Sequence, residues 1–176
     1  MQRLFLTGAL LFSSAFAFAQ TPYAGMQTRP IKALSEQQIS DLSASRGMGL
    51  AMAAELNGYP GPSHVLELAD KLELSADQRD RVKALFDAMK AEAQPLGSRL
   101  IAQETELDKL FASRSITPAN LKASMAAIAA TQGELRETHL KYHLSTADIL
   151  SASQTQKYAE LRGYVGSNRH QMQHHH

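Results

Sequence analysis

Two long stretches of the chain carry apolar residues at alternating spacings of four and three, and a short polar link at residues 113–116 separates them. The first stretch starts near Ser75 and the second near Thr117. This spacing keeps apolar side chains on one face of an α-helix, as in a coiled-coil-like pair. Because the link is short, we expect the two helices to fold back on each other as an antiparallel hairpin.

The apolar face of the first helix is mostly aliphatic. Its members are Val82, Phe86, Met89, Ala93, Leu96, Leu100, Leu107 and Leu110. Pro95 lies within it, and a bend is expected there because proline removes one backbone hydrogen bond. The face of the second helix consists of Leu121, Met125, Ile128, Gln132, Leu135, His139, Tyr142, Thr146 and Ile149. Gln132, His139 and Tyr142 stand where a coiled coil favours aliphatic residues.

Shorter helices are expected on both sides of the hairpin. Ser35, with a glutamine three residues later, predicts a helix over residues 35–56, which the turn-forming residues 57–62 end. A short helix should follow over residues 62–72, and a last one over residues 151–163. The second long helix begins with Thr-Pro, a capping residue followed by proline at the first helical position.

The composition agrees with an all-α fold. Alanine, leucine, glutamate, glutamine and lysine dominate, β-branched residues are sparse and tryptophan is absent. We therefore predict that residues 35–164 form a single domain, a long antiparallel helical hairpin with short flanking helices that is able to dimerise.

The two ends of the chain differ from this domain. Residues 1–19 have a basic start at Arg3, an apolar stretch and the cleavage site Ala17-Phe18-Ala19, which is typical of a secretory signal peptide. The alternative, an uncleaved membrane anchor, is disfavoured because the stretch is shorter than the ~20 residues that span a bilayer. Residues 20–34 lack apolar periodicity and predict a flexible arm, and residues 165–176 predict a histidine-rich flexible tail.

Charge and residue types exclude several classes of function. The chain has 18 Lys and Arg and 17 Asp and Glu, so loss of Arg3 with the signal peptide leaves equal numbers and gives no case for nucleic-acid binding. It has no cysteine, no glycine-rich phosphate loop and no serine elbow motif. The His139-x-x-x-His143 pair lacks the glutamate of a zinc protease, because residue 140 is leucine. We therefore expect no enzyme activity.

Two short segments, Leu74–Gln78 and Leu150–Gln154, are near copies of each other. Each has the form Leu-Ser-x-x-Gln, in which serine and glutamine cap the start of a helix. If the hairpin turns near Ser115, both segments lie at its open end. The same register brings the distant His64 toward the histidine pair that precedes the second copy.

The paired Leu-Ser-x-x-Gln segments, behind a signal peptide in a cysteine-free helical chain, resemble the LTxxQ-motif family of bacterial periplasmic proteins. This family includes the Spy and CpxP chaperone-like proteins, the zinc-responsive ZraP proteins and the CnrX-type heavy-metal sensors. The resemblance covers residues 47–164, with serine in place of threonine in both copies. It implies a helical hairpin, often dimeric, with a periplasmic role in envelope or metal stress.

The chain departs from the CnrX-type pattern of metal ligands. In those sensors, ligands come from a histidine pair ahead of the first motif and a His-x-x-x-Met pair ahead of the second. Here only His64 precedes the first motif, with Leu68 at the spacing of a second histidine, and Ala147 follows His143 at the spacing of the methionine. A copied site is therefore absent, and a rearranged one is possible. The sensors' membrane anchor is not expected either, so the soluble ZraP, Spy and CpxP types are closer in that respect.

Histidines are the main candidate metal ligands. His139 and His143 are four residues apart on one helix face, about 6 Å apart at the backbone, and imidazole suits zinc, copper and nickel. The hairpin register adds His64, with Glu67 and Asp87 as oxygen donors; it puts His143 opposite Asp87. The alternative is that His139 is a core residue bonded to a carboxylate or to its neighbouring tyrosine, and that His143 is solvated.

Two further groups of residues could bind metal. Met48 and Met52 are also four residues apart, and thioethers favour Cu(I), although methionines in such a helix more often serve as adaptable packing. The tail could capture metal with low selectivity through His170, His174, His175 and His176.

We therefore expect a soluble periplasmic metal-binding stress protein, a sensor, buffer or resistance accessory for copper, zinc or nickel. The alternative is an ATP-independent periplasmic chaperone of the Spy/CpxP type, which would hold unfolded clients on apolar patches of the hairpin. The partners expected are a transition metal ion, a second copy of the chain as a homodimer, and either unfolded envelope proteins or a membrane-bound signalling protein.

Overall fold

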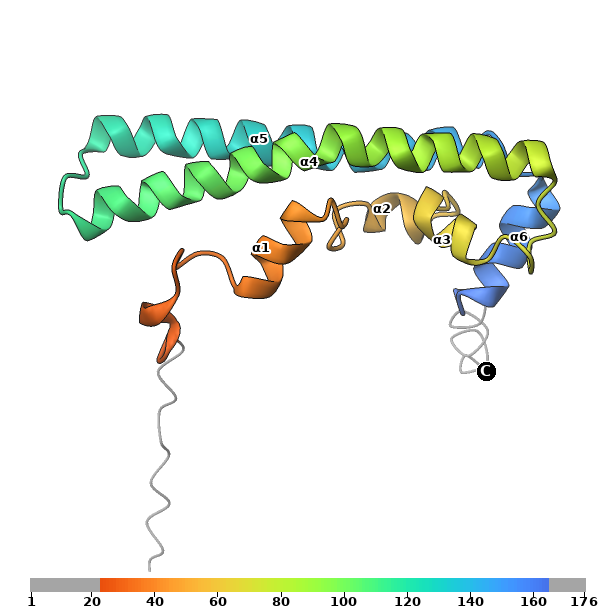
Figure 1. The fold of residues 1–176 in the computed structure, drawn as a ribbon, viewed down its shortest axis with the longest axis horizontal. Coiled ribbons are helices and arrows are strands. Elements are labelled where there is room, and N and C mark those ends of the chain that lie inside the picture. Colours follow the sequence, from red (N-terminus) through yellow and green to blue (C-terminus); the bar gives the residue numbers. More distant parts are fainter. Residues whose placement is uncertain (1–22, 165–176) are drawn as a thin grey trace, which may run out of the picture.

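The computed structural model describes residues 23–164, and these form the expected helical hairpin. Helix α4 (Ala76–Ala112) and helix α5 (Pro118–Ala147) run antiparallel along the whole length of the molecule (Figure 1). The all-α prediction is confirmed. Helix α4 continues through Pro95 without a break and changes direction along its length (Figure 1). The proposed signal peptide and the whole histidine-rich tail, residues 165–176, lie outside the described residues.

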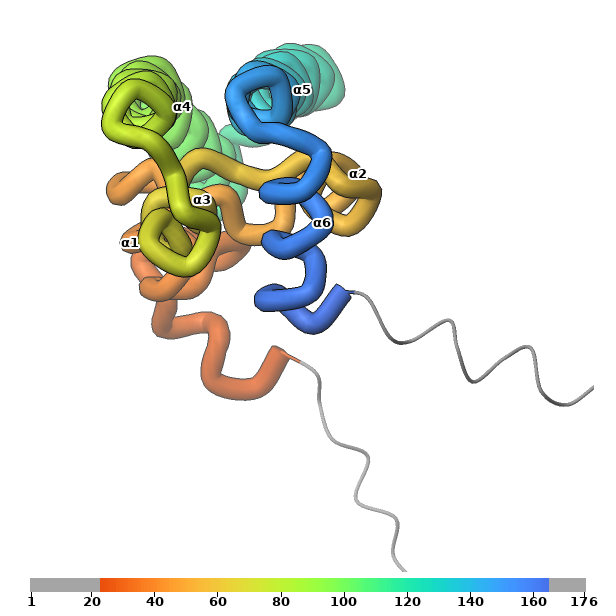
Figure 2. Tube along the Cα trace, turned by 90° about the vertical axis from the view of Figure 1, so that its right-hand side faces the viewer, coloured from red at the N-terminus to blue at the C-terminus, as the bar shows by residue number. Residues whose placement is uncertain are grey.

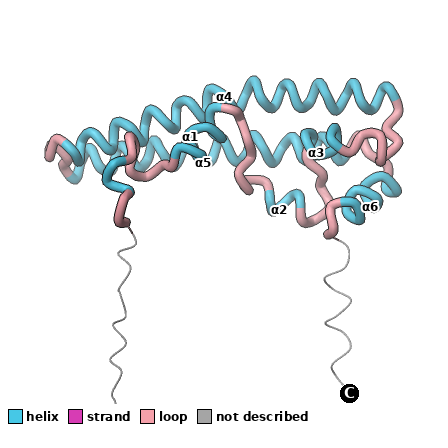
Figure 3. The backbone as a smooth tube through the Cα atoms, turned by 60° about the horizontal axis from the view of Figure 1, so that its bottom comes forward, coloured by secondary structure: helices cyan, strands magenta, loops and turns pink. Residues whose placement is uncertain are grey.

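Short helices lie against one face of the hairpin. They are the 3₁₀ turn η1 (Met26–Thr28), α1 (Glu36–Ser43), α2 (Met52–Glu55), α3 (Pro62–Glu67) and α6 (Ala152–Leu161). Viewed along its axis, the hairpin forms one layer and the short helices form the other (Figure 2). They follow one another along the hairpin from α1, with α2, α3 and α6 gathered toward its open end (Figure 3). No helix among residues 23–164 is both long and apolar enough to cross a membrane.

The predicted helix starts are confirmed by their capping bonds. In each case the side-chain oxygen of the capping residue accepts a hydrogen bond from the backbone three residues on, and the side chain there accepts one in return. The four capping residues are Ser35, Ser75, Thr117 and Ser151.

The prediction of one helix over residues 35–56 is wrong. Helix α1 ends at Ser43 and α2 begins only at Met52. Between them Ser45, Met48 and Gly49 have φ angles of 59°, 45° and 83°. These left-handed conformations are incompatible with a continuing right-handed helix. The chain instead forms a loop, residues 44–51, that folds over the hairpin.

The arm expected over residues 20–34 does not behave as a free segment at its end. Ile31 and Leu34 are buried in a cluster with α1 and both long helices. Two isolated apolar residues carry no helical period, so this packing could not be predicted from the spacing of apolar residues. A second apolar cluster at the open end joins α3, α4 and α6 around Leu72 and Tyr158.

The register of the hairpin differs from the expected one by about one helical turn. Glu92 accepts a hydrogen bond from Tyr142 at 2.7 Å and pairs with Lys141, and Arg99 pairs with Glu134. Glu92 therefore lies across from this part of α5, where the expected register had placed Asp87. A register counted from the turn accumulates error along the helices because it ignores which side chains interlock.

The two Leu-Ser-x-x-Gln segments meet at the open end, and their glutamines bind each other. Gln78 Nε2 donates to Gln154 Oε1 at 2.9 Å, and Gln154 Nε2 donates to Gln78 Oε1 at 3.0 Å. Each amide also donates to a backbone carbonyl, that of Ile149 or Leu72. The segments are thus more than two separate caps, since they join the start of α4 to the start of α6.

Gly97 sets how closely α1 approaches the hairpin. A Cβ atom at Gly97 would lie 2.3 Å from the carbonyl oxygen of Leu42, which is buried at the end of α1. Gly133, on α5, has nothing within 4 Å of the corresponding position. Both glycines lie inside long helices but only Gly97 is tightly packed, so Gly133 serves as its control.

We predict that Gly97→Ala lowers the free energy of unfolding by about 2 kcal/mol, because displacing α1 costs more than the ~1 kcal/mol that alanine contributes to a helix. Gly133→Ala should raise it by about 1 kcal/mol. Urea denaturation followed by circular dichroism measures both. A Gly97→Ala variant as stable as Gly133→Ala would contradict the close packing of α1.

Candidate metal site

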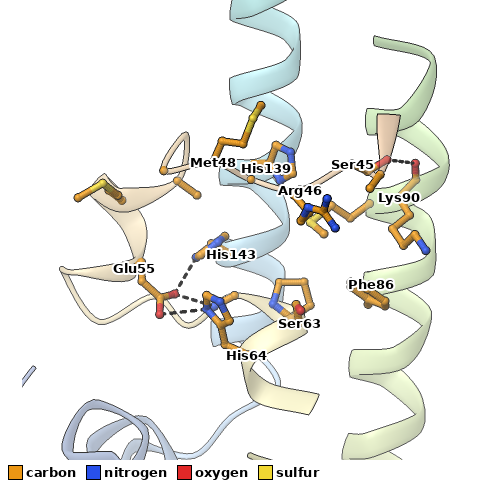
Figure 4. A pocket seen from close by; sticks show the side chains of 18 of the residues that line it. Ser45, Arg46, Met48, Glu55, Ser63, His64, Phe86, Lys90, His139 and His143 are labelled. Carbon is orange, nitrogen blue, oxygen red and sulfur yellow. Dashed lines mark hydrogen bonds and ion pairs between the residues drawn. The ribbon is translucent and has the colours of Figure 1, made fainter. Parts of the chain in front are cut away.

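A cavity of about 490 Å³ lies between the hairpin, the loop of residues 44–51, α2 and α3. It brings together five of the residues that the sequence singled out, namely Met48, Met52, His64, His139 and His143. The histidines come from two elements, α3 and α5, that are some 75 residues apart in the chain. Figure 4 shows Met48 and the three histidines around the cavity together with Glu55, which was not among the predicted ligands.

Glu55, at the end of α2, is the charged centre of this site. Its carboxylate accepts hydrogen bonds from Tyr158 and, at 2.9 Å, from Tyr164, both from the α6 region. The backbone N–H of Gly61 donates to the other carboxylate oxygen at 3.2 Å. The Nδ1 atom of His64 lies 3.3 Å from the carboxylate and that of His143 lies 3.7 Å away (Figure 4).

The surroundings of Glu55 keep its carboxylate ionised. Burial alone would raise the pKa, but the imidazole of His64 and the hydroxyls of Tyr158 and Tyr164 lower it more, to about 2. Burial and the neighbouring carboxylate in turn raise the pKa of Tyr158, so that its hydroxyl stays protonated and donates. The site therefore holds a buried anion that needs positive charge or donated hydrogen bonds.

His143 is oriented by the loop that follows α2. Its Nδ1 atom lies 2.7 Å from the carbonyl oxygen of Tyr59; since a carbonyl only accepts, Nδ1 carries the proton in this contact. Nε2 of the neutral ring is then left with a free lone pair. A Cβ at Gly61 would lie 2.8 Å from this Nε2 atom, so the glycine is what allows the ring to sit here. Nδ1 of His143 is thus occupied by the Tyr59 carbonyl, and Nε2 lies against the backbone of Gly61.

His139 lies one turn earlier on α5 and is only 3% exposed. Burial, with a smaller contribution from His143, lowers its pKa, so the ring is neutral at neutral pH. Its Nε2 atom is buried without a hydrogen-bond partner. The alternative that His139 binds Tyr142 is wrong, because that hydroxyl goes to Glu92.

The remaining predicted ligands are placed differently. Glu67 lines the cavity, but Asp87 pairs with Lys83 on its own helix and stays outside. Met48 lies in the loop before α2, so it does not share a helix face with Met52 as the spacing suggested. The tail residues His170, His174, His175 and His176 lie outside the described part of the chain.

The donor atoms of the cavity are of the types that transition metals bind, but their side chains do not converge on one point. Nε2 of His139 is buried without a hydrogen-bond partner, and the only polar partner of His64 Nδ1 is the ionised carboxylate of Glu55, 3.3 Å away. A buried nitrogen without a partner is costly unless something binds it. Yet within residues 23–164 no three histidine, aspartate or glutamate side chains converge closely enough to hold an ion. Metal binding there requires one side chain to move or a further donor to enter.

One signal in the sequence marks Glu55. It is the only acidic or basic residue, histidine aside, in residues 47–66, a segment otherwise rich in glycine, alanine and methionine. A lone carboxylate in an apolar segment tends to be buried with partners or to bind a cation. Its tyrosine partners, about 100 residues further on, could not be identified from periodicity.

Comparison with known families agrees with the observed helical fold and identifies the family of the chain. A family model described as heavy-metal resistance matches residues 46–157, a stretch that contains both Leu-Ser-x-x-Gln segments and all of the cavity histidines. The chain belongs to this heavy-metal resistance family, the LTxxQ type that the sequence repeat indicated. No curated protein and no solved structure matches the chain.

Glu55 makes stability depend on pH in a defined direction. Its folded pKa of about 2 lies below the ordinary 4.5, so the unfolded chain binds the proton first as the pH falls. We predict that the metal-free protein loses this stabilisation between pH 4.5 and pH 2, and that Glu55→Gln flattens the loss. Urea denaturation in a chelating buffer across that range measures it.

The control is Glu137→Gln, which removes an exposed carboxylate of α5. It should keep the pH profile of the unchanged protein. Equal slopes for Glu55→Gln and the unchanged protein would show that the carboxylate is not held ionised by its neighbours.

Proposed function

We propose that the protein is a periplasmic metal-binding protein of the heavy-metal stress response, and that it captures a divalent zinc, nickel or copper ion at Glu55, His64 and His143. The observation that carries this proposal is a buried, ionised carboxylate that has the Nδ1 atom of His64 3.3 Å away and that of His143 3.7 Å away. Carboxylate and imidazole are ligands that these borderline ions accept. Membership of a heavy-metal resistance family supports the same role.

Each residue around the site has a separate role in binding the ion. Glu55 supplies negative charge, and His64, on a side chain 39% exposed, gives access from solvent. The Tyr59 carbonyl holds the proton of His143 on Nδ1, so His143 would have to release this contact and turn its ring before a nitrogen could bind an ion beside Glu55. A metal ion bound here would add positive charge beside a carboxylate that is otherwise stabilised by donated hydrogen bonds and by the guanidinium of Arg162, whose Nε atom lies 3.7 Å away.

A titration of the protein with zinc and nickel, followed by calorimetry, tests the site. All variants should carry alanine at His170, His174, His175 and His176, so that the tail does not bind. We expect one divalent ion per chain. His64→Gln and Glu55→Gln should each weaken binding about 100-fold, the usual effect of losing a ligand or its support.

Glu137→Gln serves again as the matched control and should bind as the unchanged protein does. His64→Gln guards against misfolding of the Glu55 variant, because its side chain is partly exposed. Unchanged zinc and nickel affinity in both variants would refute the site, and binding that vanishes with the tail substitutions alone would assign the metal to the tail.

One observation favours the chaperone alternative. Near the closed end of the hairpin the side chains of Phe111, Leu121 and Met125 are 55%, 37% and 48% exposed. Exposed apolar residues of this size can hold unfolded segments of other proteins. This function predicts that the metal-free protein suppresses aggregation of a denatured client at equimolar amounts, and that Phe111→Ser with Met125→Ser abolishes the effect. No protection in a light-scattering assay would count against it.

A further inference from the structure

Three of the seven methionines of the chain line the same cavity, at Met48, Met52 and Met89. We propose that the part of the cavity next to His139 is a second, separate metal site, specific for Cu(I), in which Nε2 of His139 and the thioethers of Met48 and Met89 are the donors. The inference rests on the proposed function only in that the same cavity admits metal. It assigns a different ion to different donors.

The donors come from three elements that line the same cavity. His139 lies on α5 and Met89, only 6% exposed, on α4. The loop carrying Met48 packs on the His139 ring, whose Nδ1 atom is 3.6 Å from where a Cβ of the adjacent Gly47 would stand, so Nε2 is the nitrogen left for a ligand. Figure 4 labels Met48 and His139 among the residues that line the cavity. Nε2 of His139 is buried without a hydrogen-bond partner, so its lone pair is free to bind a metal ion.

The backbone at Met48 is a second, independent indication. Its φ of 45° is a left-handed conformation that methionine rarely adopts, and it directly precedes Gly49 at 83°. Strain of this kind at a residue other than glycine is concentrated at functional sites. Simple packing does not require it, since Met48 remains 42% exposed.

The charge of the donors selects the ion. His139, Met48 and Met89 are all neutral donors, and Arg46 and Lys90, which line the same cavity, repel a divalent ion more strongly than a monovalent one. The cost of burying an ion rises with the square of its charge, so a divalent ion without a carboxylate is strongly disfavoured here. Thioethers and a neutral imidazole form stable low-coordinate complexes with soft Cu(I). The cavity therefore has an anionic end at Glu55 and a neutral, sulfur-rich end at His139.

An anaerobic titration with Cu(I) against a coloured Cu(I) chelator tests the inference, again with alanine in place of the four tail histidines. The key variant is Met48→Leu/Met89→Leu, which conserves side-chain volume and so keeps the fold. We expect it to lower Cu(I) affinity at least about 100-fold and to leave zinc affinity unchanged. His139→Leu should act in the same direction. Met125→Leu, on the exposed face of α5, is the matched control and should change neither.

Glu55→Gln is the opposite variant, because it should weaken zinc binding and leave the Cu(I) affinity unchanged. X-ray absorption of the Cu(I) complex should show sulfur in the first coordination shell, and the double methionine variant should lose it. Cu(I) affinity that survives Met48→Leu/Met89→Leu, or that falls with Glu55→Gln as much as zinc affinity does, would overturn the inference. Absence of zinc binding with the methionine effect intact would refute the proposed function alone.

Discussion

The reciprocal pairing of Gln78 with Gln154 is the interaction on which the geometry of the open end depends. Each glutamine first caps its own helix, and each oxygen accepts both the local backbone N–H and the amide of the other glutamine. Their remaining N–H groups bind the carbonyls of Ile149 and Leu72. Donors and acceptors are therefore satisfied in one small network that joins the end of α5, the approach to α4 and the start of α6. Removing either glutamine would leave its partner's amide without a match.

Glu55 makes a second set of contacts, which join several segments near the glutamine pair. Its carboxylate contacts α3 through His64, α5 through His143 and the α6 region through Tyr158 and Tyr164. A buried charge of this kind is costly unless it is fully solvated by protein groups, so it favours the one arrangement that provides them. The same requirement makes it a place where a cation can compete with hydrogen bonds.

Local signals in the sequence predicted much of this fold, and non-local packing accounts for what they missed. Apolar spacing gave the hairpin, and Ser35, Ser75 and Ser151 gave three helix starts, because both signals act within a few residues. The loop at Met48 was missed because its left-handed backbone depends on contacts with α5, and Ile31 was missed because its burial depends on the hairpin being formed. For the site, the repeat brought the histidines to one end of the molecule, but Glu55 and its tyrosines meet only through the tertiary fold.

The position of Glu55 also determines which part of the fold would change when a cation binds its carboxylate. A metal ion taking oxygens of this carboxylate draws electron density from the bonds donated by Tyr158 and Tyr164 and weakens them. Those tyrosines hold α6, whereas the glutamine pair anchors only its first turn. The far end of α6 is therefore the part of the described fold whose restraint depends most directly on the charge state of the site. The hairpin is less affected, because its two long helices are held together by Glu92 with Lys141 and Tyr142, and by Arg99 with Glu134, rather than by Glu55.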